Sequence, residues 1–447
     1  EEIELGEATL YTVIKGQKIE AFTIEITKLH KQSEPSVKGI EFVVKDDSFK
    51  HSKWLSFMES RLHVMKDLLS DKGAIFISID SHEQSQLKLL CDDIFGEENF
   101  VDMLSWFKKA SPSNDAQFFS NDIEYILVYA RNKQIWRPNR LPLNEKQRKY
   151  YQNPDNDPRG DWNSATYTCN KTKEQRPSLY YPIVNPNTGE EIWPKETAVW
   201  AYSKEQNVQH IKDNLLYWGA DGKSKYPRFK KFLSNHQGVV NRTLWHYDDV
   251  GHTQGASMEL KKLDIEGFGT PKPVRLIERV IRIAGDLNSI VLDCFAGSGT
   301  TAQAVLELNQ EDGGNRHFIL CTNNENNICE NVTYPRVKTV ITGIRPDGSK
   351  YSDGIPANLK YYKTDFVARN EEYLSDALLK HISEMIQLEN GIKLDGKKYL
   401  MILTDEQADE VSSNWDQYPD VRAIYLSKNV LLTTKQETLF ENIPVYI

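Results

Sequence analysis

The residues with the clearest chemical potential lie at 291–305, which read VLDCFAGSGTTAQAV. An apolar run ends at an acid, Asp293, and the small residues Ala296–Gly299 follow before a helix is predicted to begin at Thr300. Glycines let the main chain approach a ligand closely, and the free N–H groups of a helix N-terminus favour a negatively charged group. The stretch therefore predicts a ligand site at the end of a strand. The alternative is a tight strand-to-helix turn that binds nothing.

The neighbouring residues narrow the type of ligand. A phosphate-binding P-loop needs Gly-Lys-Ser/Thr, and no lysine follows these glycines. A dinucleotide fold uses GxGxxG/A, which Gly297–Ala302 permits, and an acid about 20 residues later at the end of the next strand. Thr322 stands where that acid is expected, and Glu325 follows it. A nucleotide-linked oxidoreductase therefore remains an alternative that rests on the glycine turn alone.

A regular pattern of helices and strands surrounds the turn and positions it. A helix is predicted at Pro273–Ala284, a strand at Ile290–Asp293, a helix at Thr300–Leu308 and a strand at His317–Cys321. The last three make a βαβ unit, so the glycine turn is expected at the carboxyl edge of a parallel sheet, where α/β proteins bind ligands.

The N-terminal third shows a similar alternation. Its predicted elements are a hairpin of Leu10–Ile14 and Ile19–Ile26, a helix from Ser52 to a stop at Asp71–Gly73, a strand at Ala74–Asp80, a helix at 82–95 ended by Gly96, and a strand at Ile123–Ala130. The strand at Ala74–Asp80 is apolar on both faces, which is typical of a strand buried in a parallel sheet.

Charge is distributed unevenly along the 447 residues, whose net charge is −9. Residues 131–245 hold 20 Lys and Arg against 11 Asp and Glu, which gives this segment +9. Residues 131–250 are also rich in Pro, Asn, Tyr and Trp, and predict an inserted domain of short strands and long loops. Such a basic, aromatic region favours nucleic acid as a partner, although lysines that merely face water are the alternative. Residues from about 395 to 447 predict a small separate α/β domain.

The bulk composition limits the compartment. No apolar run approaches the roughly 20 residues that span a bilayer. The N-terminus is acidic and lacks the basic and apolar regions of a signal peptide. The five cysteines include no CxxC pair, so neither a zinc site nor a disulfide framework is predicted. We expect a cytoplasmic protein with no membrane partner.

Several motifs together resemble one family. At 293–301, DCFAGSGTT resembles the S-adenosylmethionine motif of amino-methylating DNA methyltransferases, and Lys272-Pro273 with its helix resembles the segment before that motif in their permuted β group. Four further stretches resemble, in the same order, the modification (Mod) subunit of Type III restriction-modification systems. They are FKHSKWLSFMESRL, GAIFISIDSHEQSQLKLLCDDIFGEENFV, EYILVYARNK and KNVLLTTKQETLF. The resemblance covers most of residues 42–135 and 265–447.

This resemblance implies a fold and a domain order. The fold is a Rossmann-like S-adenosylmethionine-dependent methyltransferase sheet of the α/β class, with an inserted target-recognition domain and a small C-terminal α/β domain. The implied segments are an N-terminal segment at 1–40, the catalytic half at 41–130, the DNA-binding insert at 131–250, the cofactor half at 251–390 and the C-terminal domain at 391–447.

The resemblance also implies an activity. We expect a site-specific enzyme that moves a methyl group from S-adenosyl-L-methionine to adenine N6 of double-stranded DNA, without a metal. It implies a homodimer in a bacterial cytoplasm that can pair with a separate restriction (Res) subunit. A cytosine-N4 methyltransferase shares every motif, and a catalytically silent sequence-specific DNA-binding module is the alternative from another class.

By the same resemblance, the cofactor borders the glycine turn. The implied cofactor-binding residues are Lys272, Asp293, Cys294, Phe295, Ala296, Gly297, Ser298, Gly299, Thr300 and Thr301. Asp293 is expected to hold the amino group of the cofactor, directly or through water, and Lys272 to meet its carboxylate. Asn323 or Glu325 is expected to replace the ribose-binding acid that members of this family often lack.

The insert supplies the residue types that contact DNA phosphates and base edges, in clusters. The candidate DNA-binding residues are Arg137, Arg140, Lys146, Arg148, Lys149, Lys171, Lys173, Arg176, Lys223, Lys225, Arg228, Lys230 and Lys231. The prediction concerns the clusters, because any single surface lysine is ordinarily just solvated.

One expected motif is absent. Adenine-N6 and cytosine-N4 enzymes use Asp/Asn-Pro-Pro-Tyr/Phe, because a ring-conjugated amine is a poor nucleophile and needs oxygen acceptors while the flipped base stacks on an aromatic ring. Val37–Ile40 resembles the strand that leads into this motif, and Glu41–Val44 resembles the residues that come after it. We expect a mobile loop with the motif to be missing from this sequence near Ile40–Glu41; the alternative is a natural deletion. The catalytic residues are therefore unknown.

Overall fold

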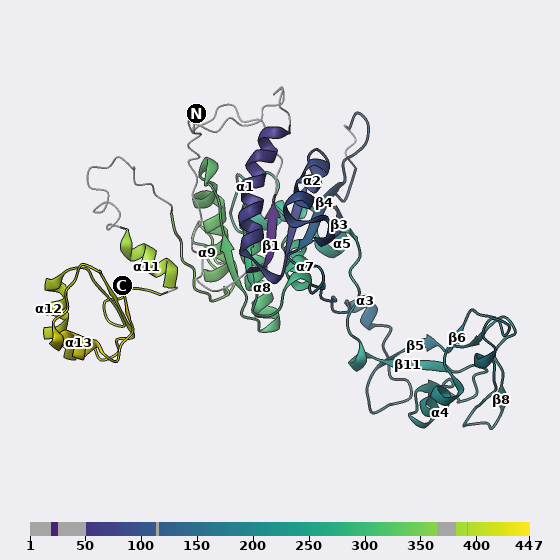
Figure 1. Cartoon of the computed structure of the whole chain (residues 1–447). Helices are drawn as coiled ribbons and strands as arrows, with labels where there is room; N and C mark the ends of the chain where they lie inside the picture. The colour runs from purple at the N-terminus through teal and green to yellow at the C-terminus, as the bar shows by residue number, and fades with distance from the viewer. Residues whose placement is uncertain (1–18, 26–50, 113–115, 364–380, 391) are drawn as a thin grey trace. The chain divides into compact units, whose positions relative to one another are not determined.

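The computed structural model describes residues 19–25, 51–112, 116–363, 381–390 and 392–447. The chain divides into two compact units (Figure 1). The smaller unit comprises residues 138–242, which fall within the range expected for the insert, and the larger unit comprises the rest of the chain. Within the described ranges, no helix has both the length and the apolar character needed to cross a membrane.

A seven-stranded sheet forms the centre of the larger unit, in the order β12-β3-β4-β2-β1-β13-β14. Its strands are β1 (Ile19–Glu25), β2 (Leu69–Ile79), β3 (Phe100–Phe107), β4 (Ile123–Ala130), β12 (Leu244–Trp245), β13 (Ile290–Asp293) and β14 (His317–Leu320). Only β4 among them is antiparallel to its neighbours, β2 and β3. The other pairings are parallel, which confirms the expected α/β fold class.

Helices cover both faces of this sheet. They are α1 (Ser52–Leu68), α2 (Gln84–Phe95), α5 (Tyr247–Val250), α6 (Thr253–Lys262), α7 (Val274–Ala284), α8 (Thr300–Asp312) and α9 (Tyr334–Thr342). Neighbouring residues of a strand point to opposite faces. Leu292 of β13 accordingly packs in the core with Trp54 and Leu62 of α1, whereas Val291 packs with Ile281 of α7 and Leu308 of α8. Each face of the sheet is therefore packed against helices.

Two expectations for the N-terminal third are wrong. The hairpin predicted for Ile19–Ile26 does not form, because β1 pairs in parallel with β2 on one edge and with β13 on the other, which leaves no edge for a hairpin partner. The first helix ends at Leu68, not at Asp71–Gly73, because the backbone turns extended at Leu69 and enters β2 directly. Leu10–Ile14 and the Ile40–Glu41 junction lie outside the described residues.

The smaller unit is built from short strands around aromatic side chains. Its elements are α3 (Glu145–Arg148), β5 (Trp162–Thr166), β6 (Thr168–Cys169), β7 (Ile183–Val184), β8 (Glu191–Ile192), β9 (Val199–Trp200), α4 (Lys204–Lys212), β10 (Leu216–Tyr217) and β11 (Arg228–Phe232). Its largest sheet has the order β10-β11-β5. Tyr167, Tyr181, Trp200 and Trp218 are buried in one cluster, so these aromatics form its core.

The C-terminal segment contains a second, smaller parallel sheet. Its elements are α11 (Ile382–Asn390), β15 (Tyr399–Ile402), α12 (Asp405–Ser413), β16 (Ala423–Leu426), α13 (Thr434–Phe440) and β17 (Val445–Tyr446). The strand order is β15-β16-β17. Leu400, Ile424 and Phe440 are buried in a core of their own, although the segment falls within the larger compact unit, so the predicted separate domain stays a prediction.

Candidate cofactor site and nucleic-acid surface

The glycine turn connects β13 to α8 at the carboxyl edge of the sheet. Gly297 and Gly299 have φ of 48° and 76°, in the left-handed region that favours glycine. A Cβ atom on Gly299 would lie 3.2 Å from Cγ2 of Thr333 and 3.3 Å from the carbonyl oxygen of Thr333. The Thr333 hydroxyl in turn donates a 2.7 Å hydrogen bond to the carbonyl of Gly297. Both the conformation and the close approach of Thr333 therefore require glycine at 299.

Asp293 holds the turn from inside. It is 1% exposed, and its Oδ1 accepts a 3.1 Å hydrogen bond from the N–H of Phe295, while its Oδ2 accepts one of 2.7 Å from the Thr301 hydroxyl. Burial raises the pKa of Asp293 to about 6, against the lowering effects of these two hydrogen bonds and of Lys272. A carboxylate that is costly to ionise but well ordered can attract a cationic ligand group.

The accessible part of the turn is limited. Phe295 and Gly297 are half-buried, whereas Ala296, Ser298 and Gly299 are buried. The ring centroid of Phe295 lies 6.4 Å from that of Phe57 on α1. The partly exposed groups of the turn therefore include an aromatic side chain and the main chain of a glycine.

Arg336 of α9 braces the turn, and sequence reasoning missed it. Its side chain is fully buried, and its Nη1 donates to Oγ of Ser298 at 3.0 Å and to Oγ1 of Thr300 at 2.8 Å. Its Nε donates to the Gln303 side chain at 2.8 Å. The sequence feature that could have indicated this role is the position of Arg336, a charged residue on the same buried face of α9 as Val337 and Val340.

Lys272 does not stand free to meet a cofactor carboxylate, which corrects that expectation. It is 3% exposed, and its Nζ lies 3.3 Å from Oε2 of Glu124 on β4. The other oxygen of Glu124 pairs with Lys108 at 2.8 Å. Burial alone raises the pKa of Glu124, but the two lysines outweigh burial and lower it from 4.5. The carbonyl of Lys272 accepts a 3.2 Å hydrogen bond from Thr300, so this ion-pair network joins the glycine turn to β4.

The end of β14 is an asparagine-rich turn. Asn324, Asn326 and Asn327 all have positive φ. The Asn323 side chain accepts a hydrogen bond from the N–H of Glu325 at 3.2 Å, and Asn323 is exposed. A ribose contact by Asn323 or Glu325 therefore stays a prediction.

Most of the candidate DNA-binding residues are exposed. They are Arg137, Arg140, Lys146, Arg148, Lys149, Lys171, Lys173, Arg176, Lys223, Lys225 and Lys231. Arg137 belongs to the larger unit and the others to the smaller one. Arg228 is half-buried, with its Nε donating to Oγ of Ser164 at 2.8 Å. The exposed residues of the smaller unit are of the types that contact DNA phosphates.

Lys230 is the exception and corrects the prediction. It is 2% exposed, and its ammonium group pairs with Asp155 and, at 2.9 Å, with Oδ2 of Asp157. Asp157 is also buried and accepts from Arg159, whose hydrogen bonds lower the pKa of Asp157. Lys230 therefore stabilises the interior of the smaller unit and does not lie on its surface.

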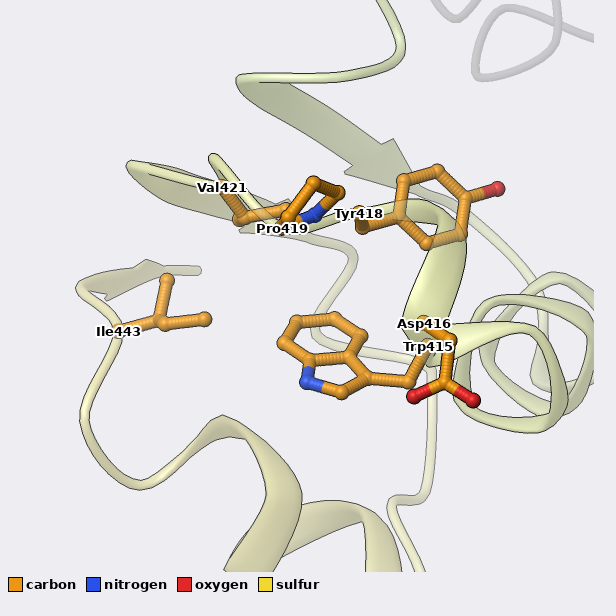
Figure 2. A pocket seen from close by; sticks show the side chains of 6 residues that line it. All are labelled: Trp415, Asp416, Tyr418, Pro419, Val421 and Ile443. Atoms are coloured by element: carbon orange, nitrogen blue, oxygen red, sulfur yellow. The ribbon is translucent and has the colours of Figure 1, made fainter.

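A separate hollow lies in the C-terminal sheet (Figure 2). It has a volume of about 350 Å³ and is lined by Trp415, Asp416, Tyr418, Pro419, Val421 and Ile443. These residues precede β16 and β17, so they lie toward the amino ends of those strands. Ligands of open α/β sheets bind beyond the carboxyl ends of strands, which separates this hollow from the predicted kind of site.

The mostly parallel sheet makes this an α/β protein. Its glycine turn follows Asp293 at the carboxyl edge of the sheet, where α/β proteins commonly bind cofactors. The chain belongs to the DNA methylase family, because the N6_N4_Mtase (DNA methylase) family model matches residues 28–333. A second family model, SpoIVB peptidase S55, matches residues 1–53, of which the structure describes 19–25 and 51–53.

Two curated relatives are Mod subunits of Type III restriction-modification enzymes. The StyLTI Mod subunit of Salmonella typhimurium is 40% identical over 276 residues, which cover 61% of this chain and 41% of the relative. The EcoPI Mod subunit of Escherichia phage P1 is 33% identical over 318 residues, covering 64% and 47%. The chain thus spans less than half the length of these relatives.

One solved structure is a putative DNA modification methylase from Thermus thermophilus complexed with S-adenosyl-L-methionine. It is 12% identical, with a TM-score of 0.31, and the match covers 68% of this chain and 81% of that one.

Proposed function

We propose that the chain is the methyltransferase region of a Mod-type subunit that methylates adenine N6 at specific DNA sites, with S-adenosyl-L-methionine as methyl donor. The observation that carries this proposal is the DNA methylase match over residues 28–333, which contains the glycine turn beyond Asp293. Two of the relatives are named Type III Mod subunits, which favours adenine N6 over cytosine N4 as the target.

The residues of the turn fit S-adenosyl-L-methionine chemically. This cofactor carries a sulfonium, an ammonium and a carboxylate, and supplies an activated methyl group. The buried carboxylate of Asp293 favours the ammonium, and the N-terminus of α8 at Thr300 and Thr301 favours an anionic group. Half-buried Phe295 offers an apolar face, and half-buried Gly297 leaves part of its main chain uncovered.

The smaller unit fits the role of target-recognition domain. Its exposed lysines and arginines supply phosphate contacts, which make binding dependent on salt. The buried aromatic cluster around Tyr167 and Trp200 keeps these short strands rigid, so that the cations have a fixed base. We infer double-stranded DNA as the partner, and a homodimer with a separate Res subunit as the assembly.

One motif that supplies acceptor oxygens for methyl transfer is not found in this sequence. The Asp/Asn-Pro-Pro-Tyr/Phe motif occurs nowhere in the 447 residues, and the segment where it is expected lies outside the described ones. The alternative is a DNA-binding protein that holds the cofactor but does not transfer the methyl group, and the match to the DNA methylase family does not favour it.

Two experiments separate these functions. Thermal unfolding of the full chain with S-adenosylhomocysteine or NAD tests the cofactor: stabilisation by the first alone supports the proposal, and stabilisation by NAD alone contradicts it. Incubation with labelled S-adenosyl-L-methionine and DNA then tests the transfer, and nucleoside analysis identifies the methylated base. Cofactor and DNA binding without transfer favours the silent DNA-binding protein. N4-methylcytosine in place of N6-methyladenine contradicts the proposed target.

A further inference from the structure

An exposed pair of aromatic residues lies on the connection between β3 and β4. Phe118 is 83% exposed and Phe119 is 93% exposed, and the value for Phe119 is the highest among the large apolar side chains that the structure describes. Gln117 and Asn121, also exposed, flank the pair. Two adjacent phenylalanines in water cost hydration free energy, so a binding partner that covers them is favoured.

The direction of the strands places this connection at the edge that carries the glycine turn. β13, β1 and β2 are parallel, and β4 is antiparallel to both β2 and β3, so β3 runs in the same direction as β13. The chain therefore leaves β3 after Phe107 and re-enters β4 at Ile123 on the edge beyond Asp293.

Polar contacts fix the base of the connection to the candidate cofactor site. The N–H of Lys108 donates to the carbonyl of Asp122 at 2.8 Å, which closes the base. The Lys108 ammonium pairs with Glu124, which also pairs with Lys272, whose carbonyl accepts from Thr300 at the start of α8. The aromatic pair thus extends from a base that is tied to the glycine turn within one compact unit.

We propose that Phe118 and Phe119 insert into the DNA duplex and occupy the space that the target base vacates when it is displaced. This inference rests on the proposed function, because only an enzyme that modifies a base has to remove that base from the stack. Apolar side chains at protein–DNA interfaces wedge between base steps, and aromatic rings stack on bases of any sequence. Amide side chains such as Gln117 and Asn121 can hydrogen-bond to the neighbouring base edges.

The test compares binding to two labelled duplexes of one sequence, one fully paired and one with a single abasic position. Fluorescence anisotropy with the full chain should show about tenfold tighter binding to the abasic duplex, where stacking costs no base displacement. The double substitution Phe118→Ala/Phe119→Ala should abolish that preference and change affinity for the paired duplex less than about twofold. Phe118→Tyr/Phe119→Tyr should keep the preference, because the rings remain.

Leu89→Ala is the matched control, because Leu89 is an apolar side chain of the same unit with 71% exposure on α2. This variant should bind both duplexes like the wild type. An unchanged preference in the double alanine variant overturns the inference and leaves the proposed function standing. A wild-type chain that binds neither duplex overturns both. A change in oligomeric mass in the double variant, with unchanged duplex preference, assigns the aromatic pair to a protein contact and also overturns the inference.

Discussion

The hydroxyl of Thr301 donates a 2.7 Å hydrogen bond to Oδ2 of Asp293, which ties the first turn of α8 to the last residue of β13. The other carboxylate oxygen accepts from the N–H of Phe295. One buried side chain therefore sets the shape of the glycine turn from both sides. Its raised pKa shows that the negative charge is held there at a cost to folding.

Asp293→Asn should preserve this shape and remove the charge. The pKa of Asp293 in the folded protein, about 6, lies above the ordinary 3.8, so the folded state keeps its proton longer than the unfolded state. The contribution of Asp293 to stability is therefore greatest below pH 4 and declines as the pH rises to 6. At pH 7 the loss is up to about 3 kcal/mol. Urea unfolding between pH 4 and 7 should show a flatter profile for the asparagine variant.

The same variant should bind S-adenosylhomocysteine more weakly, because the amino group of the ligand loses its counter-charge. Isothermal titration at pH 7.5 measures this loss. A variant that is less stable than the wild type at pH 7, yet binds the ligand normally, would show that Asp293 stabilises the fold and does not contact the ligand.

Gly299→Ala should destabilise the protein more than Gly313→Ala. Both glycines flank α8 in the left-handed region, with φ of 76° and 71°, so both substitutions carry the roughly 1–2 kcal/mol cost of that conformation. A Cβ at 313 meets nothing within 4 Å, whereas one at 299 meets Thr333 at 3.2 Å. Denaturation should therefore separate the two variants, and only Gly299→Ala should reduce cofactor binding. Equal losses at the two positions would contradict the role of Thr333.

Glu124→Ala should cost about 3–5 kcal/mol, because it leaves the buried ammonium of Lys272 without this counter-charge. Glu124→Gln should cost less, since the amide oxygen still accepts a hydrogen bond. Glu124→Leu with Lys272→Met should recover part of the loss, because the buried Lys272 charge is removed together with its partner, whereas Lys108 still loses its counter-charge. Chemical denaturation measures all three variants. A double variant worse than Glu124→Ala would refute this account.

The network should also weaken in acid. The pKa of Glu124 is lowered in the folded protein, so its stabilising contribution is complete above the ordinary 4.5 and disappears as the pH falls through the folded pKa. Glu124→Gln should accordingly lose less stability than the wild type when the pH is taken below 4.5.

Lys230→Met and Lys231→Met form a matched pair on β11. Lys230 is buried with Asp155 and Asp157, and its loss should destabilise the smaller unit by about 3–5 kcal/mol. Lys231 is exposed, so its substitution should leave stability unchanged. If Lys231 contacts a phosphate, the substitution should also reduce the slope of log affinity against log salt concentration by about 1. Limited proteolysis of the full chain and anisotropy at several salt concentrations measure the two effects. The reverse pattern would place Lys230 on the DNA surface after all.

The parts of the fold that were predictable are those with a strong local pattern. The bounds of β4 and β13 were predicted to the residue, as was the end of α2 at Gly96, because apolar runs and a terminating glycine specify them locally. The glycine turn was predictable for the same reason. β3 was missed because only Leu104 and Trp106 of its eight residues are buried, so no continuous apolar run marks it.

The remaining features depend on contacts that are distant in sequence. Lys230 and Lys231 look alike in the sequence, yet they point to opposite faces of β11, and the partners that bury Lys230 lie more than 70 residues earlier. Lys272 finds Glu124 on β4, and Arg336 finds Ser298 and Thr300. No local pattern carries these pairings.

The position of β1 suggests where an Asp-Pro-Pro-Tyr motif could be introduced into this chain. Ile19–Glu25 takes the place between β2 and β13, although it precedes residue 28, where the methylase match begins. Parallel pairing uses main-chain groups, so a transplanted strand of different side chains can dock in the same slot. Exchanging Ile19–Glu25 for a strand followed by Asp-Pro-Pro-Tyr should carry the acceptor oxygens beyond the carboxyl end of β1, the strand that pairs with β13. The existing sheet would then hold both the cofactor-binding turn and the acceptor groups that methyl transfer requires.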